Sequence, residues 1–113
     1  MAQILGYVAL DEADEFQRYA AELRLDRTAL ANLLIVRELR SGRLGELMTR
    51  YDRDLAGTEN TKIVAHQADP ATKVAFKAHA ADFKLKPSRA AAILFRAELA
   101  EHWLEASMDR ISV

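Results

Sequence analysis

Two stretches of this sequence carry the same pattern of apolar and polar positions, sixty residues apart. The first places Phe16, Tyr19, Ala20 and Leu23 at helical spacing, and the second places Phe76, His79, Ala80 and Phe83 in the same way. An apolar stripe at this spacing, with a charged opposite side, is typical of an amphipathic helix. We therefore predict helices over 11–23 and 69–83, the second opened by Asp69 and Pro70.

A second pair of helices is predicted over 29–39 and 89–99, where "ALANLLIVREL" and "RAAAILFRAEL" are apolar almost all round. Such helices must be covered from several sides. Asp26 and Pro87 mark their starts. Gly42 and Gly45 predict that the first of the two bends or restarts, whereas the second is expected to continue through "AEHWLEASM".

Each copy begins with a short segment rich in strand-forming residues, "QILGYVAL" at 3–10 and "TKIVAHQA" at 61–68. The chain thus divides into repeat one at 3–53, a linker at 54–61 and repeat two at 62–109, within a single domain of 1–113. One such unit is too small to cover its own apolar helix. Two units can cover both apolar helices if their strands pair as an antiparallel ribbon over them. A plain helical bundle is the alternative.

Composition narrows the classes of protein. The 113 residues are 50% hydrophobic, include no cysteine and carry a formal net charge of −1. A core without disulfides is therefore expected, in a reducing compartment such as the cytoplasm. No apolar run reaches the length of a membrane span, so no membrane partner is expected. Any contact with nucleic acid must come from local patches, because the whole domain is not basic.

The order strand, helix, tight turn, helix, with the phrase "YAAELRLDRTALANLLIVREL" at 19–39, resembles the ribbon-helix-helix repressors of the Arc and MetJ type. The resemblance implies a mainly α fold with a short two-stranded antiparallel ribbon, here as a tandem, single-chain pseudo-dimer. It also implies a bacterial DNA-binding transcriptional regulator that puts its ribbon into the major groove, and self-association of two such chains. Arg24 and Lys84 stand where the family usually has glycine, so they must adopt a left-handed conformation or close the turn otherwise.

Candidate DNA-binding residues follow. The resemblance implies that the ribbon reads bases, and the candidates are Gln3, Tyr7, Lys62, His66 and Gln67. The outward face of the first strand is either Gln3, Leu5, Tyr7 and Ala9 or Ile4, Gly6, Val8 and Leu10, and the register of the second strand is open. A helix start with cations and a hydroxyl beside it suits a phosphate. The phosphate candidates are Arg24, Arg27 and Thr28 in repeat one and Lys84, Lys86 and Ser88 in repeat two. Ordinary solvated surface remains the alternative for both sets.

Other chemistry is not indicated. His66, His79 and His102 lack metal-ligand spacing, and the acids of "DEADE" suit a helix start. No enzyme, metal or cofactor is therefore expected. Apolar residues beyond the two-helix units either extend the core or form a partner surface: Leu44, Leu47, Met48, Tyr51, Trp103, Leu104 and Met108. A protein-interaction module that keeps the fold without reading DNA is the alternative function.

Overall fold

A computed structural model describes residues 2–67 and 69–104, which contain two strands and five helices. The chain runs through β1 (Ala2–Ala9), α1 (Leu10–Glu22), α2 (Arg27–Ser41) and α3 (Leu44–Tyr51), then β2 (Asn60–Gln67), α4 (Pro70–Asp82) and α5 (Pro87–Glu101). Strand, helix, helix therefore occurs twice, with α1 and α4, and α2 and α5, sixty residues apart. β2 begins inside the expected 54–61 linker, and the expected end of repeat two, including Met108, lies outside the described residues.

The helix starts follow their capping residues. The Asp26 carboxylate accepts a hydrogen bond from the Ala29 N–H at 2.7 Å, and Asp69 accepts one from the Ala71 N–H at 3.0 Å. Pro70 and Pro87 occupy the first turns of α4 and α5, where a missing N–H costs nothing. The four helices expected from the apolar pattern are therefore present.

The two inter-helix turns close in the left-handed conformation at a residue other than glycine. Arg24 and Lys84 both have φ of 60°. In each turn the next N–H returns to the end of the preceding helix, from Leu25 to the Ala20 carbonyl and from Leu85 to the Ala80 carbonyl. A left-handed residue with a side chain costs roughly 1 kcal/mol. Both turns thus adopt the same left-handed closure without a glycine.

Helices α2 and α5 also end alike, which corrects one expectation. Gly42 (φ 67°) ends α2 and α3 then restarts the helix, as the glycines predict. The expectation that α5 continues through 100–108 is wrong, because α5 ends at Glu101 and His102 takes a φ of 50°. The N–H groups of Gly42 and His102 each donate to the carbonyl four residues back at 2.8 Å.

The strands pair antiparallel, in a register that joins Gln3 to His66, Leu5 to Val64 and Tyr7 to Lys62. Side chains alternate along a strand, so this register puts Ile4, Val8, Ile63 and Ala65 on the inward face, where all four are buried. Gly6 lies above α5, and a Cβ there would approach Phe95 Cε2 to 2.5 Å. The missing side chain lets the ribbon lie directly on the helix.

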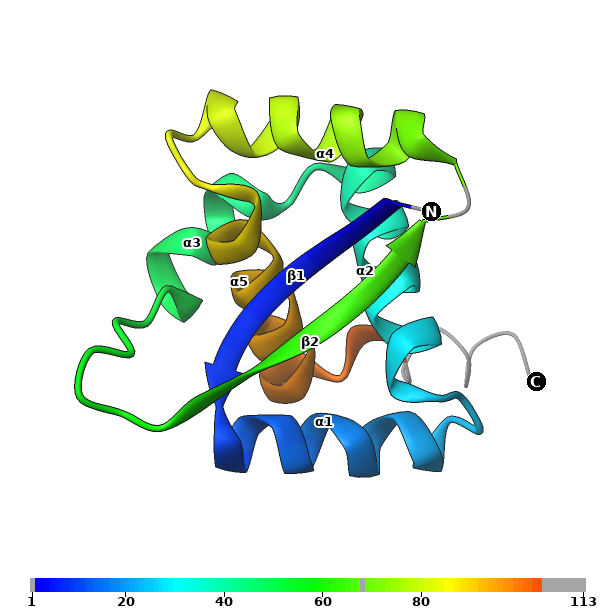
Figure 1. Ribbon diagram of the computed structural model, residues 1–113, viewed down its shortest axis with the longest axis vertical. Coiled ribbons are helices and arrows are strands. Elements are labelled where there is room, and N and C mark those ends of the chain that lie inside the picture. Colours follow the sequence, from blue (N-terminus) through cyan, green and yellow to red (C-terminus); the bar gives the residue numbers. More distant parts are fainter. Residues whose placement is uncertain (1, 68, 105–113) are drawn as a thin grey trace.

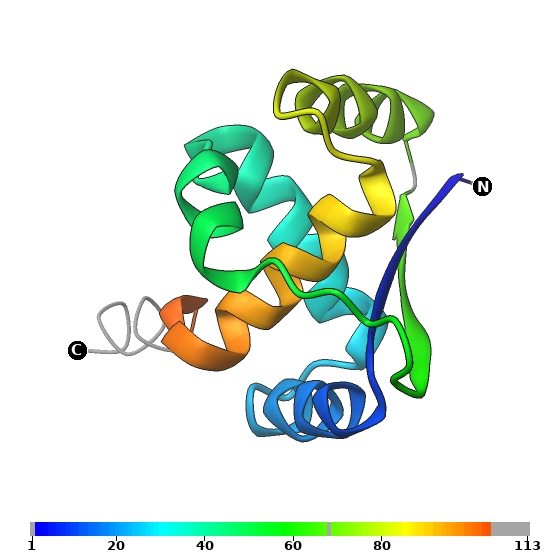
Figure 2. The same cartoon turned by 90° about the vertical axis from the view of Figure 1, so that its left-hand side faces the viewer.

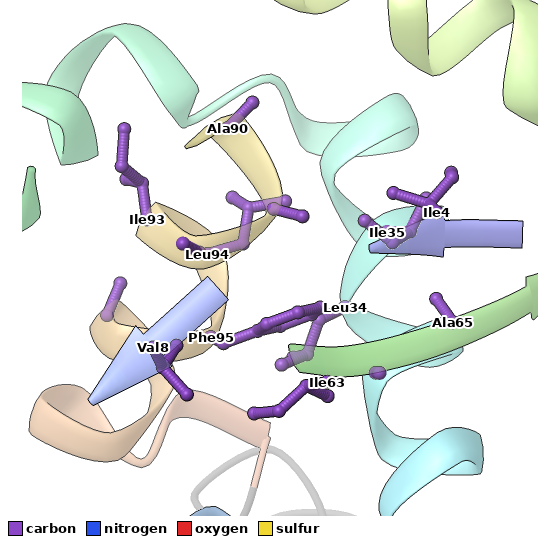
Figure 3. Packing of buried hydrophobic residues seen from close by; sticks show 14 of the residues in the cluster. Ile4, Val8, Leu34, Ile35, Ile63, Ala65, Ala90, Ile93, Leu94 and Phe95 are labelled. Carbon is purple, nitrogen blue, oxygen red and sulfur yellow. The ribbon is translucent and has the colours of Figure 1, made fainter. Parts of the chain in front are cut away.

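The core lies between the ribbon and the crossed helices α2 and α5 (Figures 1 and 2). Helix α5 packs under β1 and α2 under β2, so each strand covers a helix from the other half of the chain. Figure 3 shows Phe95 beneath the ribbon, close to Leu34 and Ile63, and the three are 0–1% exposed. Both apolar helices are thus covered from several sides, as expected.

Two buried carboxylates tie the halves together at equivalent positions. Glu38 on α2 is 3% exposed and lies 2.6 Å from His79 Nε2 on α4. Glu98 on α5 is 1% exposed and accepts a hydrogen bond from the Tyr19 hydroxyl on α1 at 2.5 Å. Each carboxylate also accepts hydrogen bonds from backbone N–H groups just beyond its own helix. Glu38 accepts from Arg43 and Leu44, and Glu98 accepts from Leu104. Glu38 and Glu98, Tyr19 and His79, and Leu44 and Leu104 are each sixty residues apart in sequence.

In the part of the chain that the structure describes, no helix is both long and apolar enough to cross a lipid bilayer.

Candidate nucleic-acid interface

The outward face of the ribbon carries three cross-strand pairs. Polar pairs lie at both ends, Gln3 with His66 and Tyr7 with Lys62, and the half-buried Leu5 and Val64 lie between them. The amide Nε2 of Gln3 is 3.3 Å from His66 Nδ1, and the Tyr7 side chain is 44% exposed. Four of the five base-reading candidates therefore share one face, and the open choice for β1 resolves to Gln3, Leu5 and Tyr7.

Gln67 does not belong to this face. It is 2% exposed and lies on the inward side with Ile63 and Ala65. The expectation that Gln67 reads bases is therefore wrong, because a strand alternates faces at every residue and the sequence leaves the register open. Ala9, expected to share a face with Gln3, is also buried, since it forms the junction with α1.

Nothing in residues 2–67 and 69–104 packs over the outward face of the ribbon. Figure 2 shows the two strands along one side of the molecule, with every helix behind or beside them. Helices α4 and α1 border opposite sides of the ribbon (Figure 1). Among the described residues, this face is therefore left uncovered.

The start of α2 lies beside β2. Arg27 and Thr28 line a groove of about 510 Å³, which we call the β2 groove. Gln17, Asp26 and Asn32 also line it, and His66 of β2 lies on its ribbon side. The Asp26 carboxylate already accepts the hydrogen bond of the Ala29 N–H. It therefore puts a negative charge at the helix start, where an anion would bind. Arg27 and Thr28 therefore line this groove together with a carboxylate that already accepts a hydrogen bond from the helix start.

The start of α5 lies beside β1. Lys86 and Ser88 line a groove of about 430 Å³, which we call the β1 groove, together with Gln3 and Tyr7. Lys86 occupies the N-cap position and makes no side-chain cap bond within the described residues, so the start of α5 carries a cation in place of a carboxylate. Arg24 and Lys84 are exposed in their turns but line neither groove.

Two residues of the β1 groove were missed by reasoning from the sequence. Lys73 and Lys77 of α4 complete its lining. Their spacing of four residues puts them on one side of a helix, which the sequence does show. That this side faces the ribbon follows only from how α4 packs.

A neighbouring cleft shares Tyr7, Lys86 and Ser88 with the β1 groove and adds three arginines that are already paired. It is lined by Arg53, Arg89 and Arg96, among others. Arg89 makes two hydrogen bonds to Asp52, at 2.7 and 3.0 Å, and Arg96 donates to Glu12 at 2.7 Å. Burial by itself raises the pKa of Glu12. Hydrogen bonds from Arg96 and the Ala9 N–H act against it, together with the charges of Arg96 and Arg53, and the net result is a lowered pKa. These arginines stabilise the fold and leave little charge for a ligand.

Comparison of the chain with protein-family models, curated protein sequences and solved structures finds no match.

Proposed function

We propose that this protein is a single-chain ribbon-helix-helix regulator that binds duplex DNA through the outward face of its ribbon. The twofold occurrence of strand, helix, helix supports the tandem arrangement. The carboxylate contacts from Glu38 to His79 and from Glu98 to Tyr19 support it further, because each joins one half of the chain to the other at equivalent positions.

The observation that carries DNA binding is the open ribbon face, with Gln3, Tyr7, Lys62 and His66 on it. A two-stranded ribbon fits the major groove of B-form DNA, where side chains can reach base edges. Glutamine can pair with adenine and lysine with guanine. The apolar Leu5 and Val64 suit contact with a thymine methyl group. The ribbon thus carries both hydrogen-bonding and apolar side chains, the two kinds of group that distinguish base pairs in the major groove.

The test uses labelled duplexes from a random-sequence pool, selected by retention on the protein. We expect a selected pool with a sequence preference and a wild-type affinity that falls as salt rises from about 50 to 200 mM. Gln3→Ala and Lys62→Ala should alter the preference, because they remove groups that contact bases. Arg50→Ala is the matched control for Lys62→Ala, since it removes one exposed cation from α3, on the side away from the ribbon.

An altered sequence preference in both ribbon variants, with the control unchanged, would support the proposal. An absence of duplex binding at the lowest salt concentration would refute it and favour the protein-interaction module. Binding with no sequence preference in the wild-type protein would refute base reading by the ribbon.

A further inference from the structure

The two grooves beside the ribbon are similar in size and differ in charge. They measure about 430 and 510 Å³ and are built from equivalent elements, α4 with the start of α5 and α1 with the start of α2. The β1 groove is lined by three cations and no carboxylate: Lys73, Lys77 and Lys86. The β2 groove is lined by one cation, Arg27, and one carboxylate, Asp26.

The difference arises at equivalent positions of the two halves. Gln17 stands where the other half has Lys77, and Asp26 stands where it has Lys86. Ala13, the counterpart of Lys73, is 4% exposed and offers no polar group. All five lysines of the chain lie between positions 62 and 86, whereas every cation of the first half is an arginine.

The lysines of the β1 groove are available to a ligand. Lys73, Lys77 and Lys86 are exposed, and no ion pair found in the described part of the chain involves any of them. A duplex whose major groove receives the ribbon brings a phosphate backbone to each side of the ribbon. On the β1 side the backbone would meet three unpaired cations. On the β2 side it would meet the carboxylate of Asp26 as well as Arg27.

From this geometry we infer that the protein holds DNA by one flank: Lys73, Lys77 and Lys86 bind the phosphates of the backbone beside β1, and the β2 flank adds no net phosphate contact. This inference rests on the proposed DNA binding. The ribbon then reads bases while one side of the molecule supplies the salt-dependent part of the affinity. It also explains how a chain with a net charge of −1 can bind a polyanion, because three cations outside any ion pair of the described residues lie together beside β1.

The experiment compares two double variants, Lys73→Gln with Lys77→Gln and Arg24→Gln with Arg27→Gln. Each removes two positive charges, so both have the same net charge, and the removed side chains come from opposite flanks. The probe is a labelled duplex of random sequence, and the measurement is the slope of log affinity against log salt. Thermal unfolding of each variant checks that the fold is retained, which we expect because no ion pair or hydrogen bond between described residues uses these four side chains.

We expect the lysine variant to make the salt slope shallower by about two, because each lost phosphate contact removes roughly 0.9 from it. The arginine variant should leave the slope unchanged. Equal changes in both variants, or a larger change in the arginine variant, would overturn the one-flank contact while leaving DNA binding itself established. Failure of the wild-type protein to bind any duplex would overturn the proposed function, and this inference with it.

Discussion

Glu98→Gln tests whether the buried carboxylates hold the two halves of the protein together. The Glu98 side chain is fully buried, and its two oxygens accept three hydrogen bonds. Oε2 accepts from the Tyr19 hydroxyl and the Leu104 N–H, and Oε1 accepts from Arg37 Nη2 at 2.8 Å. Glutamine keeps the shape but replaces one acceptor oxygen with a donor NH₂ group. At least one of the three donors must therefore lose its acceptor.

The least costly orientation keeps the amide oxygen toward Tyr19 and Leu104 and turns the NH₂ group toward Arg37. A buried donor without an acceptor costs about 1–3 kcal/mol, and more when it is charged. The Arg37 side chain is 24% exposed, so water offsets part of this cost. We expect the free energy of unfolding to fall by about 2 kcal/mol, which lowers Tm by about 8 °C or more in a domain of this size.

Urea unfolding followed by tryptophan fluorescence measures this loss. Trp103 is the sole tryptophan, and its ring lies 4.5 Å from the Arg37 guanidinium carbon, so it reports on the same region. Glu101→Gln is the control on the same helix. Glu101 is partly exposed and pairs with Arg43 at 3.0 Å, so its loss should cost no more than about 1 kcal/mol. The reasoning is refuted if Glu98→Gln costs less than about 0.5 kcal/mol, the range of ordinary surface substitutions.

Three further predictions concern stability. Gly6→Ala should cost about 1–3 kcal/mol in urea unfolding, because its Cβ would lie 2.5 Å from Phe95 Cε2, and unchanged stability would contradict the close approach of β1 to α5. His79→Tyr should retain stability because tyrosine occupies the equivalent position 19, whereas His79→Phe should lose about 1 kcal/mol with its contact to Glu38, and equal losses would argue against equivalence of the two halves. The pKa of Glu12 is lowered in the folded state, so its contribution to stability is complete above its usual pKa of 4.5 and is lost as pH falls through the lowered pKa. Glu12→Gln should therefore flatten the acid side of the curve of unfolding free energy against pH, and a variant with the same acid dependence as the wild type would argue against this role.

Local features were predictable from the sequence because neighbouring residues decide them. The Asp26 and Asp69 caps, the prolines at the starts of α4 and α5 and the restart after Gly42 depend on contacts within a few residues. The failed continuation of α5 shows the limit of this reasoning. His102 takes a left-handed conformation that is uncommon for residues other than glycine, and the buried Glu98 carboxylate accepts a hydrogen bond from the Leu104 N–H just beyond it.

By itself, the sequence determined that strand, helix, helix occurs twice and that two of the helices are apolar almost all round. Only the tertiary structure decided which strand face is open, because a shift of one residue in register exchanges the two faces and places Gln67 inside rather than outside. It also decided that Lys73 and Lys77 lie beside β1, a strand of the opposite half. Such groupings join residues about seventy positions apart, and no local pattern along the chain can specify them.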